Sequence, residues 1–228
     1  MKQIFIDGSA GTTGLNLQQR LQQRKDVTLI PLEEAHRKDP KARKQAIEQA
    51  DVIVLCLPDE AAKEAVELAK GCKAVILDAS TAHRTAPGWV YGLPELSGQR
   101  WQKVQNAQRI AVPGCHASGF IALVQPLRAA VLLPADAILH CHSITGYSGG
   151  GKAMIAQYEQ GFCSAAALSG RDDMELTVHG CQDRILLVAR YDNLGKGACG
   201  AALECINLVL GTQHTTGLVL GQQEEKAW

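Results

Sequence analysis

Short apolar segments alternate with helical segments along the first third of the chain, and this alternation restricts the fold more than any other sequence feature. The patterns predict strands over residues 4–6, 27–32, 52–57 and 74–77, and helices over 14–24 and 59–70. A further helix is predicted to open at Asp39-Pro40, where Asp39 suits the N-cap and Pro40 the first helical position. Segment 52–57 is apolar without interruption, which is typical of a strand buried on both faces. We therefore expect an α/β protein whose parallel sheet is covered by helices on both sides.

Composition argues against several classes of function. The chain has 228 residues, 46% of them hydrophobic, and a formal net charge of zero, so a sizeable core is expected and a nucleic-acid partner is not. No apolar run is long enough to span a membrane, and residues 1–3 lead into a strand rather than a signal peptide, so we expect a cytoplasmic protein. The eight cysteines are scattered, which favours free thiols, and no metal site is expected.

A glycine-rich loop, Gly8-Ser9-Ala10-Gly11-Thr12-Thr13-Gly14, follows the first predicted strand and precedes the first predicted helix. Glycines at this spacing permit a tight turn, a close approach of the backbone to a pyrophosphate, and close packing of helix on strand. The spacing differs from the GxGxxG pattern of dinucleotide-binding loops, and an ordinary glycine-rich turn is the alternative. The order strand, loop, helix favours a dinucleotide site.

The residues after the second predicted strand bear on the choice of cofactor. Glu33 and Glu34 occupy the place where an acidic residue binds the ribose in such folds. His36, Arg37 and Lys38 follow at once, and these cations favour the 2′-phosphate of NADP. A solvated surface patch is an equally good interpretation of the three cations.

One cysteine stands out in the stretch Val112-Pro113-Gly114-Cys115-His116-Ala117-Ser118-Gly119-Phe120. Cys115 comes directly after a Pro-Gly turn and at the start of an apolar run, so we predict that it begins a helix. Unpaired backbone N–H groups and the helix dipole favour a thiolate at that place, and a thiolate is a nucleophile. The alternative is a buried structural thiol, as expected for most of the other seven cysteines.

Six motifs follow one another along the chain. They are the glycine-rich loop, Asp78-Ala79-Ser80-Thr81-Ala82-His83-Arg84, Tyr91-Gly92-Leu93-Pro94-Glu95-Leu96, Pro113-Gly114-Cys115, Gly146-Tyr147-Ser148-Gly149-Gly150-Gly151-Lys152 and Asp192-Asn193-Leu194-Gly195-Lys196-Gly197-Ala198. In this order they resemble the shorter, type 2 branch of the N-acetyl-γ-glutamyl-phosphate reductases, within the semialdehyde dehydrogenase superfamily. The resemblance covers residues 2–211.

The resemblance implies a Rossmann-type domain and an NADPH-dependent reduction in arginine biosynthesis. N-acetyl-γ-glutamyl phosphate would be reduced to the semialdehyde with release of phosphate, through a thioester on the catalytic residue Cys115. It also implies a small-molecule acyl phosphate or semialdehyde and phosphate as binding partners, no membrane or nucleic-acid partner, and a tendency to form homo-oligomers.

Further site residues follow from the resemblance alone. The implied cofactor-binding residues are Gly8, Ser9, Gly11, Thr12, Thr13, Gly14, Ser80, Gly149, Gly150, Asn193, Lys196 and Gly197. Arg84 and Ser148 are implied substrate-binding residues, although a surface arginine in a loop is an equally good interpretation of Arg84.

The chain departs from the family pattern near the nucleophile. Val112 stands where the family usually has Asn, and His116 stands where it usually has an aromatic residue. His116 is the histidine certain to lie near Cys115. For His140, His142 and His179 a structural role is the better interpretation.

A larger departure follows residue 161. The segment 158–161 runs almost directly into 173–180, so a block is missing that in the family builds most of the substrate domain and carries the catalytic histidine. We expect an NADP-binding Rossmann-type domain over 1–145, completed by a helix over 197–210, an abbreviated α+β substrate domain over 146–196, and a polar tail over 212–228. The substrate domain is expected to use strands 137–145, 174–180 and 185–192 and a helix over 152–160, and to expose apolar strand faces.

Three functions remain open at this level. The first is the reductase, the second a non-catalytic NADP-binding remnant, and the third a related semialdehyde dehydrogenase acting on aspartyl phosphate. The motifs over 146–152 and 192–198 argue against the third. Cofactor binding is common to all three, so only turnover and its dependence on Cys115 separate them.

Overall fold

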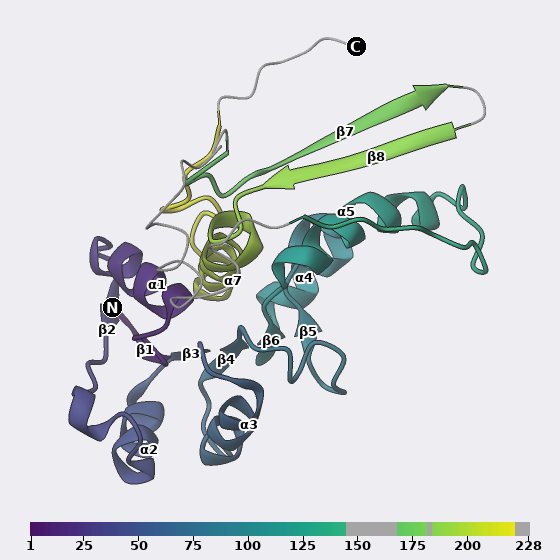
Figure 1. The fold of residues 1–228 in the computed structure, drawn as a ribbon. Coiled ribbons are helices and arrows are strands. Elements are labelled where there is room, and N and C mark those ends of the chain that lie inside the picture. Colours follow the sequence, from purple (N-terminus) through teal and green to yellow (C-terminus); the bar gives the residue numbers. More distant parts are fainter. Residues whose placement is uncertain (145–167, 182–183, 222–228) are drawn as a thin grey trace.

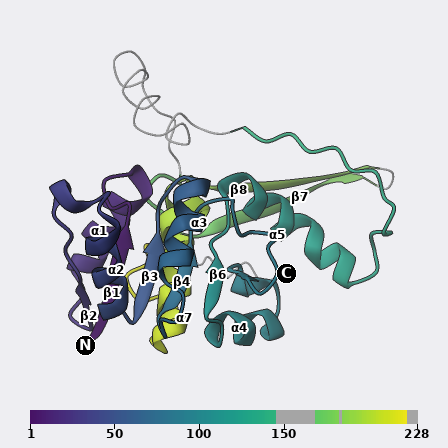
Figure 2. The same ribbon diagram turned by 90° about the horizontal axis from the view of Figure 1, so that it is seen from below.

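Six parallel strands form the larger sheet of the computed structural model, which describes residues 1–144, 168–181 and 184–221. The strand order is β2-β1-β3-β4-β6-β5 (Figures 1 and 2). The bounds are β1 Lys2–Asp7, β2 Val27–Leu29, β3 Val52–Leu55, β4 Val75–Asp78, β5 Val90–Tyr91 and β6 Arg109–Ala111. The expected α/β class and the parallel pairing are confirmed.

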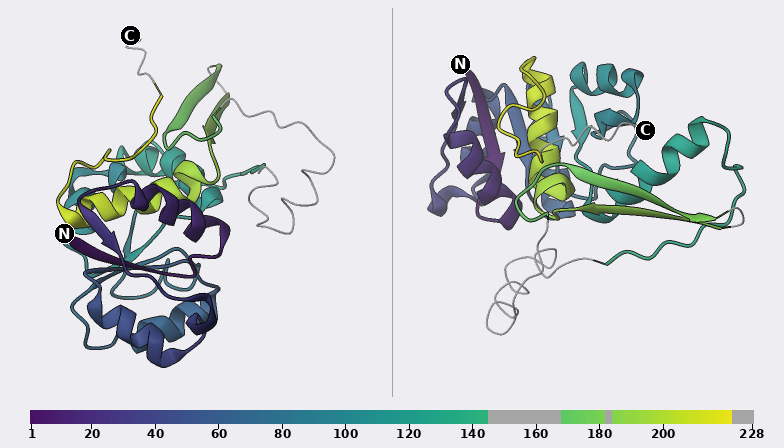
Figure 3. Two further views of the ribbon diagram at one scale, coloured as in Figure 1. Left: turned by 90° about the vertical axis from the view of Figure 1, so that its left-hand side faces the viewer. Right: turned by 90° about the horizontal axis from the view of Figure 1, so that it is seen from above.

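Helices cover both faces of this sheet (Figure 3, left). Those that share one hydrophobic cluster with the sheet are α1 (Thr12–Gln22), α4 (Gly98–Gln105) and α7 (Gly200–Leu210). Those that pack in the cluster on the opposite face are α2 (Pro40–Gln49) and α3 (Asp59–Leu68). At the start of α2 the Asp39 carboxylate accepts the Lys41 N–H at 2.9 Å, so the predicted N-cap is confirmed. None of the described helices is long and apolar enough to cross a membrane.

Alternate residues of each central strand enter the two clusters. Ile4 and Ile6 of β1 pack toward α1 and α7, whereas Phe5 between them packs toward α2 and α3. All four residues of β3 are buried, which explains why this strand is apolar without interruption.

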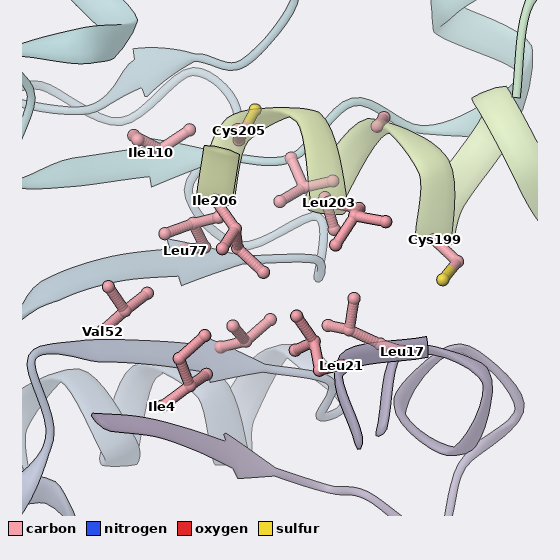
Figure 4. Close-up of a cluster of buried hydrophobic side chains, with 14 of the residues drawn as sticks. Ile4, Leu17, Leu21, Val52, Leu77, Ile110, Cys199, Leu203, Cys205 and Ile206 are labelled. Carbon is pink, nitrogen blue, oxygen red and sulfur yellow. The ribbon is translucent and has the colours of Figure 1, made fainter. Parts of the chain in front are cut away.

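The C-terminal helix lies deep in the first cluster. Leu203 and Ile206 of α7 lie over Leu77 of β4 in Figure 4, beside Leu17 and Leu21 of α1. Where the sequence predicts a helix over 197–210, the structure has a π-helical turn over Gly195–Cys199 that continues into α7. A helix from the end of the chain therefore completes one face of a sheet built by the first half.

The second sheet is a hairpin of β7 (Met174–Cys181) and β8 (Arg184–Tyr191), which projects from the body beside α5 (Cys115–Ala129) (Figure 1). These two strands confirm the predictions over 174–180 and 185–192.

The prediction of a third strand is wrong for residues 137–144, which pair with no strand of the described chain. Ile138 and Ile144 there are 88% and 98% exposed. Apolar alternation alone does not make a strand, because the backbone needs a neighbouring strand and β7 and β8 bond to each other. Residue 145 and the predicted helix over 152–160 lie outside the described residues.

The segment 212–221 packs on the body, which differs from the expectation of a polar tail starting at 212. Leu218 packs against the first cluster. The Asp172 amide donates to the Val219 carbonyl at 2.7 Å, and the Val219 amide donates to the Asp172 carboxylate at 2.7 Å. Arg20 of α1 pairs with the same carboxylate and donates to the Gly217 carbonyl at 2.8 Å. Residues 222–228 lie outside the described part.

Candidate functional site

A cavity of about 500 Å³ opens at the carboxyl edge of the six-stranded sheet. Its walls come from the loops after β1, β3, β4 and β6 and from the turn before α7. Strands β1 and β3 are neighbours with β2 on the far side of β1, so the chain winds in opposite directions from this point. In open α/β sheets, ligands bind where the winding reverses.

The glycine-rich loop forms the first wall. Gly8 has φ +88°, and a Cβ there would lie 2.3 Å from the Cys56 carbonyl oxygen. A Cβ on Gly14 would lie 2.5 Å from the Gly8 oxygen, so glycine at position 14 allows α1 to pack closely on the loop. Gly11 is the N-cap of α1, and together with Thr12 through Gly14 it lines the cavity. Gly8 and Ser9 shape the turn and do not line the cavity.

The nucleophile candidate lines the same cavity. Cys115 is the first residue of α5 with Gly114 as N-cap, so the predicted helix start is confirmed. The Ser118 amide and hydroxyl both donate to the Gly114 carbonyl at 2.9 Å, which fixes the first turn. Gly197 approaches so closely that a Cβ there would lie 2.9 Å from the Cys115 Cβ. Cys115, Gly197 and Asn193 all line the cavity.

Arg84 lies against the turn that precedes the nucleophile. A Cβ on Gly114 would be 2.3 Å from Arg84 Nη1, so only glycine leaves room for the guanidinium. Arg84 Nη2 donates to the Ala79 carbonyl at 3.3 Å, while Nε is buried without a hydrogen-bond partner among the described residues. The side chain also lines the cavity. This cation is therefore placed beside the start of α5, where an anionic group would be stabilised.

Ser80 is hydrogen-bonded to Asp78, the last residue of β4. The buried Asp78 carboxylate accepts the Ser80 amide at 2.9 Å and the Ser80 hydroxyl at 2.7 Å. It also lies 2.6 Å from His83 Nδ1, and the His83 ring stacks on Trp89. This network holds the loop that carries Arg84, and Ser80 does not line the cavity.

Lys196 points into the protein. Its ammonium group forms ion pairs with Glu95 and, at 2.7 Å, with Glu204. Burial by itself would lower the Lys196 pKa, but the two carboxylates outweigh burial and raise the pKa. The side chain is buried and absent from the cavity lining, unlike its neighbours Asn193 and Gly197.

The residues at the two departures from the family pattern lie in different environments. Val112 is buried in the first cluster, at 1% exposure, and also borders the cavity. His116 lines the cavity, and its Nδ1 lies 2.5 Å from the Ser143 hydroxyl. His179 is exposed and bonds to Thr177, away from this site. The predicted ligands Ser148, Gly149 and Gly150 lie outside the described residues.

Comparisons with known proteins agree with this architecture. A family model for the NAD-binding domain of semialdehyde dehydrogenases matches residues 3–104. N-acetyl-γ-glutamyl-phosphate reductase 2 of Nostoc sp. is 33% identical over 317 residues, and the alignment covers 94% of this chain and 98% of the relative. The chain belongs to the N-acetyl-γ-glutamyl-phosphate reductase family.

Within this family the chain is short. N-acetyl-γ-glutamyl-phosphate reductase 2 of Pseudomonas putida is 52% identical over 166 residues, which are 72% of this chain and 53% of the relative. The chain thus spans about half the length of this relative. The alignment with the Nostoc reductase is longer than the 228 residues of the chain and reaches nearly all of both proteins, so the missing block is internal.

The fold is shared more widely than the family. Aspartate semialdehyde dehydrogenase II of Vibrio cholerae, solved in complex with ASA, has a TM-score of 0.61 and covers 92% of this chain and 98% of its own. Its sequence identity is 13%, so this likeness concerns the fold alone.

Several cavity residues of this reductase family member were not singled out from the sequence. Cys56 and Leu57 follow β3, and Ala79 follows β4, at the same edge of the sheet. Their position at strand ends was an available signal, because the carboxyl ends of parallel strands share one edge. Tyr191 does not line the cavity but bonds to the first turn of α5, and the sequence carried no such signal for it.

Proposed function

We propose that this chain is an NADPH-dependent reductase that converts N-acetyl-γ-glutamyl phosphate to N-acetylglutamate semialdehyde through a thioester on Cys115. The observation that carries the proposal is a shared cavity, which both the glycine-rich loop and Cys115 line. Family membership supports the substrate class, since the relatives compared carry the name of this reductase.

The glycine-rich loop fits a dinucleotide. Gly8 and Gly14 leave out the Cβ atoms that would collide with the backbone, so the N-terminus of α1 can face a pyrophosphate directly. Gly11, Thr12 and Thr13 would hold the pyrophosphate, and Asn193 and Gly197 would lie toward the nicotinamide. When bound, the nicotinamide supplies the hydride that reduces the thioester.

The chain's own groups account for the acyl transfer. The Cys115 thiolate attacks the acyl carbon, the bond from that carbon to the phosphate oxygen breaks, and phosphate leaves with the electron pair. The first N–H groups of α5 have no partner within the helix and would stabilise the oxyanion. Arg84 would neutralise the leaving phosphate from the same side of the cavity.

Proton transfer would fall to His116. It is the one histidine among the described residues that line the cavity. The bond from Nδ1 to Ser143 leaves the other ring nitrogen available. General acid–base catalysis by a positioned side chain is worth about 10²–10⁴ in rate.

A preference for NADP would come from the segment after β2. Arg37 and Lys38 follow a short helical turn over Glu34–His36, and Arg37 Nε is buried without a hydrogen-bond partner in the described part of the chain. Arg37 also pairs with Glu34 at 3.2 Å. The 2′-phosphate would take up the remaining donors of this guanidinium.

The test is phosphate-dependent reduction of NADP by N-acetylglutamate semialdehyde, with Cys115→Ser and Cys72→Ser side by side. Cys72 follows α3 on the opposite face of the sheet, so its variant is the matched control. We expect the rate to fall by more than about 10³-fold in Cys115→Ser and to stay unchanged in Cys72→Ser. A folded wild-type chain that binds NADP without turnover would instead favour the non-catalytic remnant, because the missing block removes part of the relatives' structure.

A further inference from the structure

A side chain from the distant strand β8 is hydrogen-bonded to the first turn of α5. The Tyr191 hydroxyl, at the end of β8, donates to the Cys115 carbonyl and accepts the Gly119 N–H at 3.1 Å. These two backbone groups are the pair that an α-helix joins directly. The phenol therefore bridges the hydrogen bond that begins at the nucleophile candidate itself.

Gly119 makes room for this approach. A Cβ there would lie 2.8 Å from the Tyr191 hydroxyl oxygen, 2.9 Å from Cε1 and 3.2 Å from the Ala189 Cβ. Contacts below 3.0 Å force a shift, so any larger residue at 119 would displace the phenol. A glycine destabilises a helix interior by about 1 kcal/mol relative to alanine. At position 119 the glycine permits the contact with Tyr191.

The same segment also holds Cys115 from its other side. Asp192 follows Tyr191, accepts the Leu194 and Gly195 amides at 2.7 and 2.6 Å, and through its carbonyl accepts the Gly197 amide at 3.0 Å. Gly197 in turn lies against the Cys115 Cβ. The segment 191–197 thus contacts Cys115 at two places, at its carbonyl through Tyr191 and at its Cβ through Gly197.

The Tyr191 phenol remains a hydrogen-bond donor over the pH range in which the enzyme would work. Burial raises the Tyr191 pKa, so the hydroxyl keeps its proton at neutral pH. A neutral phenol can donate to the Cys115 carbonyl and accept from Gly119 at the same time.

We propose that Tyr191 is a positioning residue for Cys115, whose hydroxyl bridge in the first turn of α5 aims the thiol and the adjacent free N–H groups into the cavity. The role of the thiol as nucleophile rests on the proposed function. The bridge itself does not depend on turnover, because it acts on the orientation and exposure of the sulfur.

The test uses the full chain and measures alkylation of Cys115 by iodoacetamide, quantified on the Cys115 peptide by mass spectrometry. Tyr191→Phe keeps the ring and removes the hydroxyl, and we expect the alkylation rate to fall about fivefold, the size of one neutral hydrogen bond. Gly119→Ala should produce a similar fall by displacing the phenol. The double variant should fall no further, since both changes remove one contact.

Thr212→Val is the matched control. The Thr212 hydroxyl donates to the Asn207 carbonyl at 3.2 Å, at the far end of α7, so the variant loses a comparable bond away from the cavity. We expect it to leave Cys115 alkylation unchanged while lowering the melting temperature about as much as Tyr191→Phe.

Turnover separates this inference from the proposed function. In an active enzyme, Tyr191→Phe should lower kcat and leave KM unchanged. Alkylation of Cys115 within twofold of wild type in Tyr191→Phe would overturn the positioning role, whatever the activity. Slower alkylation in a chain without turnover would support the positioning role and count against the reductase.

Discussion

At the residue scale, missing Cβ atoms decide the geometry of the cavity. Gly8, Gly14, Gly114 and Gly197 each lie where a Cβ would come within 3.0 Å of another residue. For Gly8, Gly114 and Gly197 the neighbour is a cavity-lining residue, and for Gly14 it is Gly8 within the glycine-rich loop. All four glycines lie in motifs that the sequence shares with the family, and the structure supplies the particular atom that each of them avoids.

Gly8→Ala should therefore lower the free energy of unfolding more than an alanine substitution at positive φ ordinarily does. Gly71 has a similar φ of +84°, but no atom lies within 4 Å of the place its Cβ would take, so Gly71→Ala measures the backbone strain alone, about 1–2 kcal/mol. Gly8→Ala adds a collision with the Cys56 carbonyl, and we expect a loss above about 3 kcal/mol in the free energy of unfolding, with weaker NADP binding. Urea denaturation of both variants checks this, and equal losses would contradict the steric explanation.

At the element scale, one partly buried ion cluster joins the turn before α7 to the segment after β5, the edge strand of the sheet. Lys196, in the π-helical turn before α7, bonds to Glu95 in the loop after β5 and to Glu204 within α7. The sequence motif suggested a cofactor contact for Lys196. The structure instead gives its ammonium two carboxylate partners inside the protein.

Lys196→Met should destabilise the fold by about 3–5 kcal/mol, because it leaves the Glu204 carboxylate buried at 6% exposure without its lysine partner. Adding Glu204→Gln removes that charge and should recover part of the loss. Chemical denaturation and NADP titration of the single and double variants separate the two roles. Unchanged stability together with lost NADP affinity would restore the cofactor-binding interpretation.

At the scale of the whole molecule, the hairpin of β7 and β8 leaves apolar surface uncovered. Val178 and Ile185 lie on one face of the hairpin and are 70% and 72% exposed. Leu186, on the opposite face, is 61% exposed and lies opposite His179. Among the described residues nothing covers these side chains, since a two-stranded sheet has no layer of its own to pack against.

We expect the chain to self-associate through the face that carries Val178. Replacing Val178 and Ile185 together by Thr should reduce the rise of the sedimentation coefficient with concentration, because it removes adjacent apolar groups from one exposed face. Leu186→Thr removes a similarly exposed side chain from the other face and should behave like wild type. A wild-type chain that sediments as a monomer at all concentrations would show that this face needs no partner.

Local sequence patterns were sufficient to predict the parallel α/β sheet, the N-cap at Asp39 and the start of a helix at Cys115. These features depend on periodicity and on the chemistry of helix ends, which a short stretch of residues contains completely. The partners of the long polar side chains and of the strands depend instead on the tertiary structure. Lys196 meets Glu95 across 101 positions and Tyr191 meets Cys115 across 76, and residues 137–144 pair with no strand of the described chain. Such contacts depend on how distant segments are brought together in space, and no local pattern encodes them.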